Sequence, residues 1–165
     1  RIIPLVIATL GNKELMKDWL LHQGHVTHNH EKSDIGSQIL GEVAMATILQ
    51  GQTAPLHTLV HGLAKEYPEF DYRKYKGETD GYIVYTVLIV LHFFFNTNDF
   101  ESCLLGIVNR GGDADTNAGI AGMLAGAFYG LESIPTRWLK KLYPAVKKQI
   151  QQQVNDLFTT FPYEE

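Results

Sequence analysis

The sequence has little cysteine, no concentration of positive charge and no long apolar run. Cys103 is the single cysteine in 165 residues, which excludes an internal disulfide and a cysteine-based zinc finger. This cysteine usage fits a reducing compartment, so we expect a cytoplasmic location. The 14 Lys and Arg residues are outnumbered by 18 Asp and Glu residues, for a net charge of −4. Because no stretch gathers the basic side chains that track a phosphate backbone, nucleic acid is not an expected partner.

The most apolar segment, residues 83–95, contains 13 residues, whereas a membrane-spanning helix needs about 20. We therefore expect no membrane span. The segment is too long for a typical buried strand and is predicted to be a buried helix. Residues 1–10 lack the small-residue cleavage site of a secretory leader and are predicted to enter the core. Because the sequence starts at Arg1 without an initiator Met, we expect further chain upstream.

What the sequence does contain is enough apolar residues, 45%, to bury the core of one domain. These residues recur mostly at helical spacing, which predicts an all-α fold in one compact helical domain. Ser33 and Asp34 are the expected N-cap residues of the second helix, and Pro55 is expected to open the third. The predicted helices cover residues 13–23, 35–50, 55–63, 83–95, 99–109, 116–129 and 138–158, with Pro144 as a kink or break in the last.

The helix predicted over residues 116–129 has few bulky side chains. Gly119, Gly122 and Gly126 lie inside it, together with the small residues Ala118, Ala121 and Ala125. Each glycine costs about 1 kcal/mol relative to alanine in a helix interior. We therefore expect other backbones to approach this helix closely, which predicts a central position.

A Gly-Gly-Asp-Ala-Asp-Thr-Asn segment occupies residues 111–117, at the start of that helix. The two glycines allow the backbone to turn tightly and to approach a ligand. Asp113, Asp115 and Thr116 offer three hard oxygen donors, a set that suits Mg²⁺ or Mn²⁺. The alternative is that one aspartate only caps the helix. A calcium EF-hand is excluded, because Ala118 and Leu124 stand where that loop needs a glycine and a carboxylate.

Three histidines stand within residues 25–30, and imidazoles can bind metal, donate hydrogen bonds or titrate near neutral pH. The alternative is an ordinary polar loop. His57 and His61 have the spacing of helical zinc ligands, but Thr58 replaces the glutamate of the metalloprotease motif, so we expect surface histidines. The segment Glu-Thr-Asp-Gly-Tyr at residues 78–82 is either a helix cap or a ligand-facing loop whose Tyr82 covers a base or sugar.

Residues 27–34, Gly81 with Tyr82, and residues 109–122 together resemble motifs of the ADP-ribosylglycohydrolases, most closely those of the dinitrogenase reductase-activating branch. The resemblance extends over essentially the whole chain. It implies an all-α hydrolase that removes ADP-ribose from a modified side chain, arginine in the best-known branch, with two Mg²⁺ or Mn²⁺ ions. The residues that it implies are Asp113 and Asp115 as catalytic residues and, with Thr116, as metal ligands, and His28, Gly81, Tyr82, Gly111 and Gly112 as substrate-binding residues.

The sequence departs from the family pattern in one respect, because the N-terminal Thr-Asp-Asp motif and further acidic residues are not found in it. We therefore expect residues 1–165 to be the C-terminal portion of a single ADP-ribosylglycohydrolase-like domain, with weak or no activity alone. The remainder is expected upstream or in a second polypeptide. The expected partner is an ADP-ribosylated protein or ADP-ribose. The alternative function is a non-catalytic module that binds ADP-ribose or serves as a helical scaffold without a complete metal site.

Overall fold

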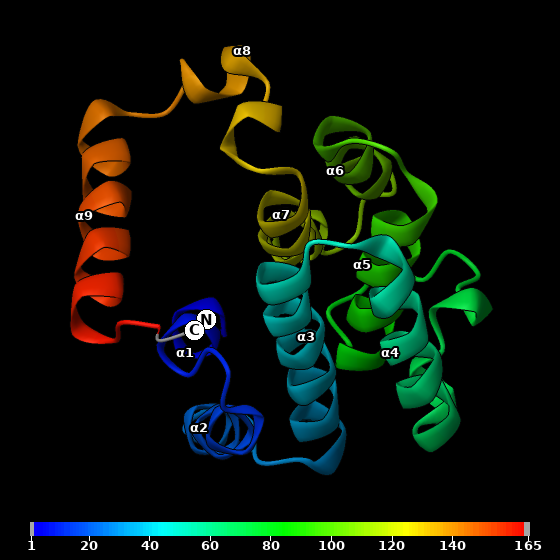
Figure 1. Cartoon of the computed structure of the whole chain (residues 1–165). Helices are drawn as coiled ribbons and strands as arrows, with labels where there is room; N and C mark the ends of the chain where they lie inside the picture. The colour runs from blue at the N-terminus through cyan, green and yellow to red at the C-terminus, as the bar shows by residue number, and fades with distance from the viewer. Residues whose placement is uncertain (1, 164–165) are drawn as a thin grey trace.

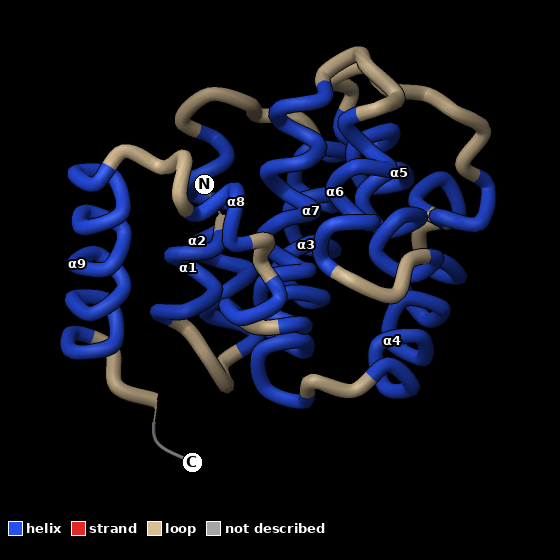
Figure 2. Tube along the Cα trace, turned by 90° about the horizontal axis from the view of Figure 1, so that it is seen from above, coloured by secondary structure: helices blue, strands red, loops and turns tan. Residues whose placement is uncertain are grey.

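The computed structural model describes residues 2–163, and every regular element in that range is helical (Figures 1 and 2). The all-α prediction is confirmed. Arg1 lies outside the described residues, while Val6 in the first helix is fully buried, as expected for a segment that enters the core. The elements are α1 (Ile3–Ala8), α2 (Lys13–His25), α3 (Glu31–Gln50), α4 (Thr53–Glu66), the 3₁₀ turns η1 (Pro68–Phe70) and η2 (Tyr72–Lys74), α5 (Ile83–Asn96), α6 (Phe100–Val108), α7 (Ala114–Tyr129), the 3₁₀ turn η3 (Leu131–Ser133), α8 (Thr136–Leu139) and α9 (Pro144–Thr160).

Helix α7 is central, as predicted, and packs against α3, α5 and α6 (Figure 1). The close approach does not occur at its glycines, however. A Cβ added at Gly119 would meet no neighbouring atom within 4 Å, and at Gly122 or Gly126 it would make only ordinary van der Waals contact. Instead, Ala121 and Ala125 are fully buried. The small methyl groups of the alanine face, rather than bare glycines, bring the neighbouring helices close.

Two predicted helix starts are wrong. Helix α3 begins at Glu31, because the ring Nδ1 of His30 accepts a hydrogen bond from the Lys32 amide at 3.1 Å and caps the helix. Ser33 and Asp34 therefore lie inside its first turns instead of capping it. Helix α4 begins at Thr53. Pro55 lies in its first turn, where the missing amide hydrogen removes no intrahelical bond.

Helix α5 confirms the choice of a helix over a strand for the apolar segment. Eight of its residues are buried, and they include neighbouring positions from Thr86 to Leu91, so the helix is covered on more than one side. A helix enclosed in this way is apolar over most of its circumference, and β-branched residues are tolerated there because tertiary packing outweighs their weak helix propensity. In residues 2–163 no helix has both the length and the apolarity to cross a membrane.

The single helix predicted over residues 138–158 is divided into α8 and α9. Pro144 is the first residue of α9, so the break that it was predicted to cause is confirmed. Proline fits the first helical position because the amide there has no partner to lose. None of the residues of α9 is buried, and Val146, Ile150 and Val154 form a partly exposed apolar stripe along it. Helix α9 stands at one side of the molecule, where it contacts α1 (Figures 1 and 2).

Candidate functional site: an acidic loop at the start of the central helix

The loop between α6 and α7 turns on two consecutive glycines. Gly111 and Gly112 have φ angles of +72° and +63°, which are left-handed conformations that side chains with a Cβ adopt at a cost. After this turn, the amide of Asn117 donates to the Asp113 carbonyl at 3.0 Å, and α7 begins at Ala114, two residues earlier than predicted. The turn therefore places Asp113, Asp115 and Thr116 together at the first turn of the central helix.

A second loop, residues 78–82, packs directly on this turn. The Asp113 amide donates a hydrogen bond to the carbonyl oxygen of Thr79 at 2.8 Å. A Cβ at Gly112 would overlap the hydroxyl and carbonyl oxygens of Thr79, and a Cβ at Gly81 would lie 2.8 Å from Asp113 Oδ2. Gly112 is therefore required sterically, whereas a side chain at Gly81 would displace only the end of the Asp113 side chain. The two loops, which α5 and α6 separate in the sequence, form one continuous surface.

The helix-capping alternative for Asp113 does not describe the structure. Asp113 occupies the N-cap position of α7, but its side chain accepts no capping hydrogen bond. Its half-buried carboxylate lies beside Gly81. Asp115 and Thr116 follow in the first turn and are exposed. The two carboxylates and the Thr116 hydroxyl therefore lie at the N-terminal end of α7.

Asn117 is a residue of this site whose role the sequence did not reveal. It is fully buried, and its Nδ2 lies 3.4 Å from the Thr79 carbonyl oxygen. Its buried Oδ1 accepts no hydrogen bond from the residues that the structure describes. The signal that could have identified it is its position one turn after Asp113, on the side of α7 that faces the core.

Tyr82 connects this surface to the start of α3. Its side chain is 42% exposed, and its amide donates to Asp80 Oδ1 at 2.9 Å. The Lys32 Nζ lies 5.9 Å from the centre of the Tyr82 ring, and its interaction with the Tyr82 side chain raises the pKa of Lys32. Tyr85 meets the ring edge-on at 5.2 Å. The aromatic face is thus held in place while it stays accessible to a ligand.

The three histidines before α3 have different local partners. His25 contacts the carboxylate of Asp34, with Nε2 at 3.0 Å from Oδ2, and His30 caps α3. His28 is exposed, and its Nδ1 lies 2.8 Å from the Thr27 hydroxyl. The structure therefore joins Gly81, Tyr82 and residues 111–116 in one surface, while the hydrogen bond of His28 is to its own neighbour in the chain.

The acidic loop offers the types of ligand atom that suit a divalent cation, but too few ligands for a complete coordination sphere. Carboxylate and hydroxyl oxygens are the ligands that Mg²⁺ and Mn²⁺ prefer. Within residues 2–163, no group of three or more His, Cys, Asp or Glu side chains is placed to hold a metal ion. The acidic loop would therefore contribute part of a coordination sphere. Cys103 is not an alternative centre, because burial raises the pKa of its thiol to about 11 and keeps it protonated.

The fold and the loop together define an all-helical protein with an oxygen-rich acidic site at its central helix. A family model for the ADP-ribosylglycohydrolases matches residues 1–165, and the chain belongs to that family. The ADP-ribosyl-[dinitrogen reductase] glycohydrolase of Rhodospirillum rubrum is 41% identical over 157 residues, which cover 95% of this chain and 53% of that protein. The ADP-ribosylarginine hydrolase Tri1 of Pseudomonas putida (strain GB-1) is 30% identical over 147 residues, or 85% of this chain and 39% of that protein.

A solved structure leads to the same family. A chain of an ADP-ribosylglycohydrolase-related protein complex superposes with a TM-score of 0.77 and 27% sequence identity, over 94% of this chain and 56% of that chain. The relatives are hydrolases by name, and the resemblance expected from residues 27–34, 81–82 and 109–122 is confirmed at the level of the family. This chain spans about half the length of the Rhodospirillum rubrum relative and less of the Pseudomonas putida one.

Proposed function

We propose that residues 1–165 are the C-terminal portion of an ADP-ribosylglycohydrolase domain, and that the complete protein removes ADP-ribose from a modified arginine side chain. The observation that carries this proposal is the junction of the two loops, because it sets Asp113 against Gly81 and Thr79. Asp115 and Thr116 follow Asp113 directly, and the exposed Tyr82 follows Gly81. Two relatives support the reaction class by their names, one acting on ADP-ribosyl-dinitrogen reductase and one on ADP-ribosylarginine.

In this proposal each part of the surface has a role. Asp113, Asp115 and Thr116 would hold Mg²⁺ or Mn²⁺, two ions in the complete site, and such ions supply an activated water at neutral pH and positive charge for oxygen ligands. The two aspartates give the surface the negative charge that favours a positive centre developing at the anomeric carbon of the ribose. Gly111 and Gly112 allow the main chain to approach the ligand, and His28 contributes from the loop before α3. The remaining metal ligands would come from the rest of the domain, in the same chain or in a partner polypeptide.

The decisive experiment compares binding with turnover. The complete protein is titrated calorimetrically with ADP-ribose in the presence and absence of Mn²⁺, and release of ADP-ribose from an ADP-ribosylated arginine substrate is measured under the same conditions. We expect metal-dependent binding and metal-dependent release. Binding of ADP-ribose without its release from the substrate would contradict the hydrolase and support a non-catalytic ADP-ribose-binding module. If neither binding nor release is observed, both hypotheses are wrong. The cytoplasmic location stays a prediction.

Tyr82→Ala is expected to weaken substrate binding without abolishing turnover. Stacking of a base on an aromatic side chain contributes about 1–3 kcal/mol, so we expect KM to rise about tenfold while kcat changes little. Tyr82→Phe, which retains the ring, should keep the parent KM. Tyr143→Ala is the matched control, because Tyr143 is 80% exposed on another part of the surface. Equal KM values for Tyr82→Ala and the parent protein would remove Tyr82 from the substrate site.

A further inference from the structure

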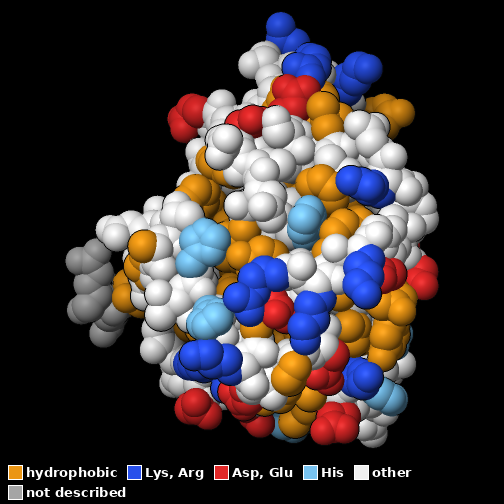
Figure 3. Space-filling model, turned by 90° about the vertical axis from the view of Figure 1, so that its right-hand side faces the viewer, with side chains coloured by type: hydrophobic (Ala, Val, Ile, Leu, Met, Phe, Trp, Pro, Cys, Tyr) orange, Lys and Arg blue, Asp and Glu red, His pale blue; other side chains and the backbone are white. Residues whose placement is uncertain are grey.

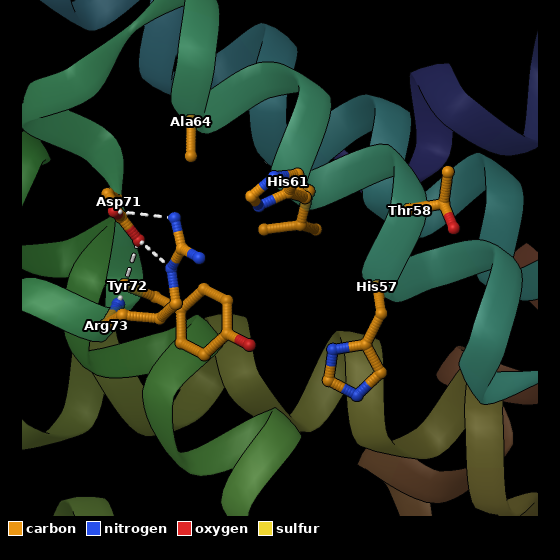
Figure 4. A pocket seen from close by; sticks show the side chains of 8 residues that line it. His57, Thr58, His61, Ala64, Asp71, Tyr72 and Arg73 are labelled. Carbon is orange, nitrogen blue, oxygen red and sulfur yellow. Dashed lines mark hydrogen bonds and ion pairs between the residues drawn. The ribbon is translucent and has the colours of Figure 1, made fainter.

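A concave surface lies between α4 and the 3₁₀ turn η2, and it shares no lining residue with the acidic-loop site. This cavity has a volume of about 460 Å³, within the range typical of small-molecule sites. Figure 4 shows its side chains from close by, and Figure 3 shows histidine side chains among Lys and Arg side chains on this face of the molecule. The lining residues with polar side chains are His57, Thr58, His61, Asp71, Tyr72 and Arg73.

The only carboxylate of this lining is already paired. Asp71 is 8% exposed, and it accepts hydrogen bonds from Arg73 Nε at 2.8 Å, from Arg73 Nη2 at 2.9 Å and from the Arg73 amide at 3.2 Å. These bonds hold the pKa of Asp71 below its usual range. The third guanidinium nitrogen of Arg73 is turned away from Asp71, toward the cavity (Figure 4). Asp71 thus orients Arg73 and leaves one donor group for a ligand.

Two of the other polar side chains, His57 and Tyr72, are held by a shared aromatic contact. The ring of Phe95 on α5 stacks on Tyr72 at 5.1 Å and lies 4.5 Å from the ring of His57. Burial raises the pKa of Tyr72, so its hydroxyl keeps its proton at neutral pH. His61 lies one helical turn after His57, on the same side of α4, and both histidines are exposed, as predicted. Figure 4 shows His57 and Tyr72 on facing sides of the cavity.

The polar lining is therefore dominated by hydrogen-bond donors. Arg73 offers N–H groups, Tyr72 a hydroxyl hydrogen, and each imidazole one N–H when neutral and two when protonated. A ligand that suits such a lining carries several acceptor oxygens and negative charge, and arginine is the side chain best matched to phosphate geometry. We propose that this cavity binds a phosphate-bearing small molecule. The site is independent of the proposed hydrolytic function.

Calorimetric titration of the full chain with pyrophosphate tests this site, with malonate as a carboxylate of similar size. We expect binding of pyrophosphate that is stronger than binding of malonate. Arg73→Lys keeps a cation beside Asp71 but lacks the third guanidinium nitrogen, and we expect it to weaken binding about tenfold, the effect of one hydrogen bond to a charged group. The double substitution His57→Ala with His61→Ala removes the N–H donors of two exposed side chains and is expected to weaken binding as much or more.

The controls are matched by residue type. His22→Ala changes an exposed histidine on α2 that pairs with Asp18, and Arg137→Lys changes an arginine that also pairs with one carboxylate, that of Glu101. Both should bind pyrophosphate like the parent chain. A comparison of AMP with inorganic phosphate shows which kind of phosphate ligand the cavity binds. Tighter binding of AMP would indicate a nucleotide, and equal binding would indicate the free anion. No binding at millimolar pyrophosphate, or binding that Arg73→Lys and the histidine variant leave unchanged, would overturn the proposal.

Discussion

Asp115→Ala in the complete protein is expected to abolish metal-dependent release of ADP-ribose, with a loss of about a thousandfold or more. The expectation follows from the position of Asp115, which is exposed in the first turn of α7 beside Asp113 and Thr116. Loss of this carboxylate would remove one of the three oxygen donors that the loop offers. Turnover is measured by release of ADP-ribose at saturating Mn²⁺.

The fold should tolerate this substitution. The buried side of α7 is formed by other residues, among them Ala121 and Leu124, so helix content measured by circular dichroism should stay near that of the parent. The lost interaction of the carboxylate with the helix N-terminus costs only about 0.3–1 kcal/mol. Asp156→Ala, which changes an aspartate of α9 that bonds to Gln152, is the control and should leave turnover unchanged. Parent-like turnover of Asp115→Ala would remove the acidic loop from the reaction.

Gly112→Ala is expected to lower the free energy of unfolding by about 2–4 kcal/mol. Two effects add. The left-handed φ angle of +63° costs a residue with a Cβ about 1–2 kcal/mol, and the added Cβ would overlap the carbonyl and hydroxyl oxygens of Thr79. Relief of this overlap requires the two loops to separate, which breaks the hydrogen bond from the Asp113 amide to Thr79. We therefore expect weaker binding of Mn²⁺ and ADP-ribose as well.

Substitutions at two other glycines, measured by denaturant titration, separate the conformational cost from the steric overlap. Gly111 has a similar φ angle of +72°, but a Cβ there would meet nothing within 4 Å, so Gly111→Ala should show the conformational cost alone. Gly119 has no such angle and equally open surroundings, so Gly119→Ala should stabilise the chain by about 1 kcal/mol through helix propensity. If Gly112→Ala and Gly111→Ala lower the free energy of unfolding by the same amount, the contact of residue 112 with Thr79 does not contribute to stability.

The sequence predicted the helices better than their ends. Apolar spacing indicated the main helices, and length decided correctly that residues 83–96 form a helix. The error at α3 arose because a cap depends on where a side chain points, whereas α4 begins without a side-chain cap that could mark its start. His30 caps α3 through a ring nitrogen, and histidine is not among the residues that usually serve in that position.

The sequence predicted most of the residues that form the candidate site, but not the contacts that bring them together. The motif at residues 111–117 identified the carboxylates and the threonine. The segment at residues 78–82 indicated Tyr82 as one of two alternatives, and the resemblance added Gly81. What no local pattern shows is that the Thr79 carbonyl accepts hydrogen bonds from both Asp113 and Asn117. Such a contact between distant segments depends on how α5, α6 and α7 pack. The cavity between α4 and η2 was missed for the same reason, since Arg73 and His61 line one cavity only after α4 and η2 pack against each other.

The outlying position of α9 has a practical consequence for protein engineering. Within the described chain α9 packs chiefly against α1, at the periphery, and the ring of Phe161, just after it, meets Trp19 edge-on at 6.1 Å. A version of the protein that ends before Pro144 would lack a helix whose Val146, Ile150 and Val154 are partly exposed. Helices α3, α4, α5 and α7, which carry the two proposed sites, pack mainly against one another and against α6. Shortening the chain there is thus the natural first step toward a smaller and better behaved form for crystallisation.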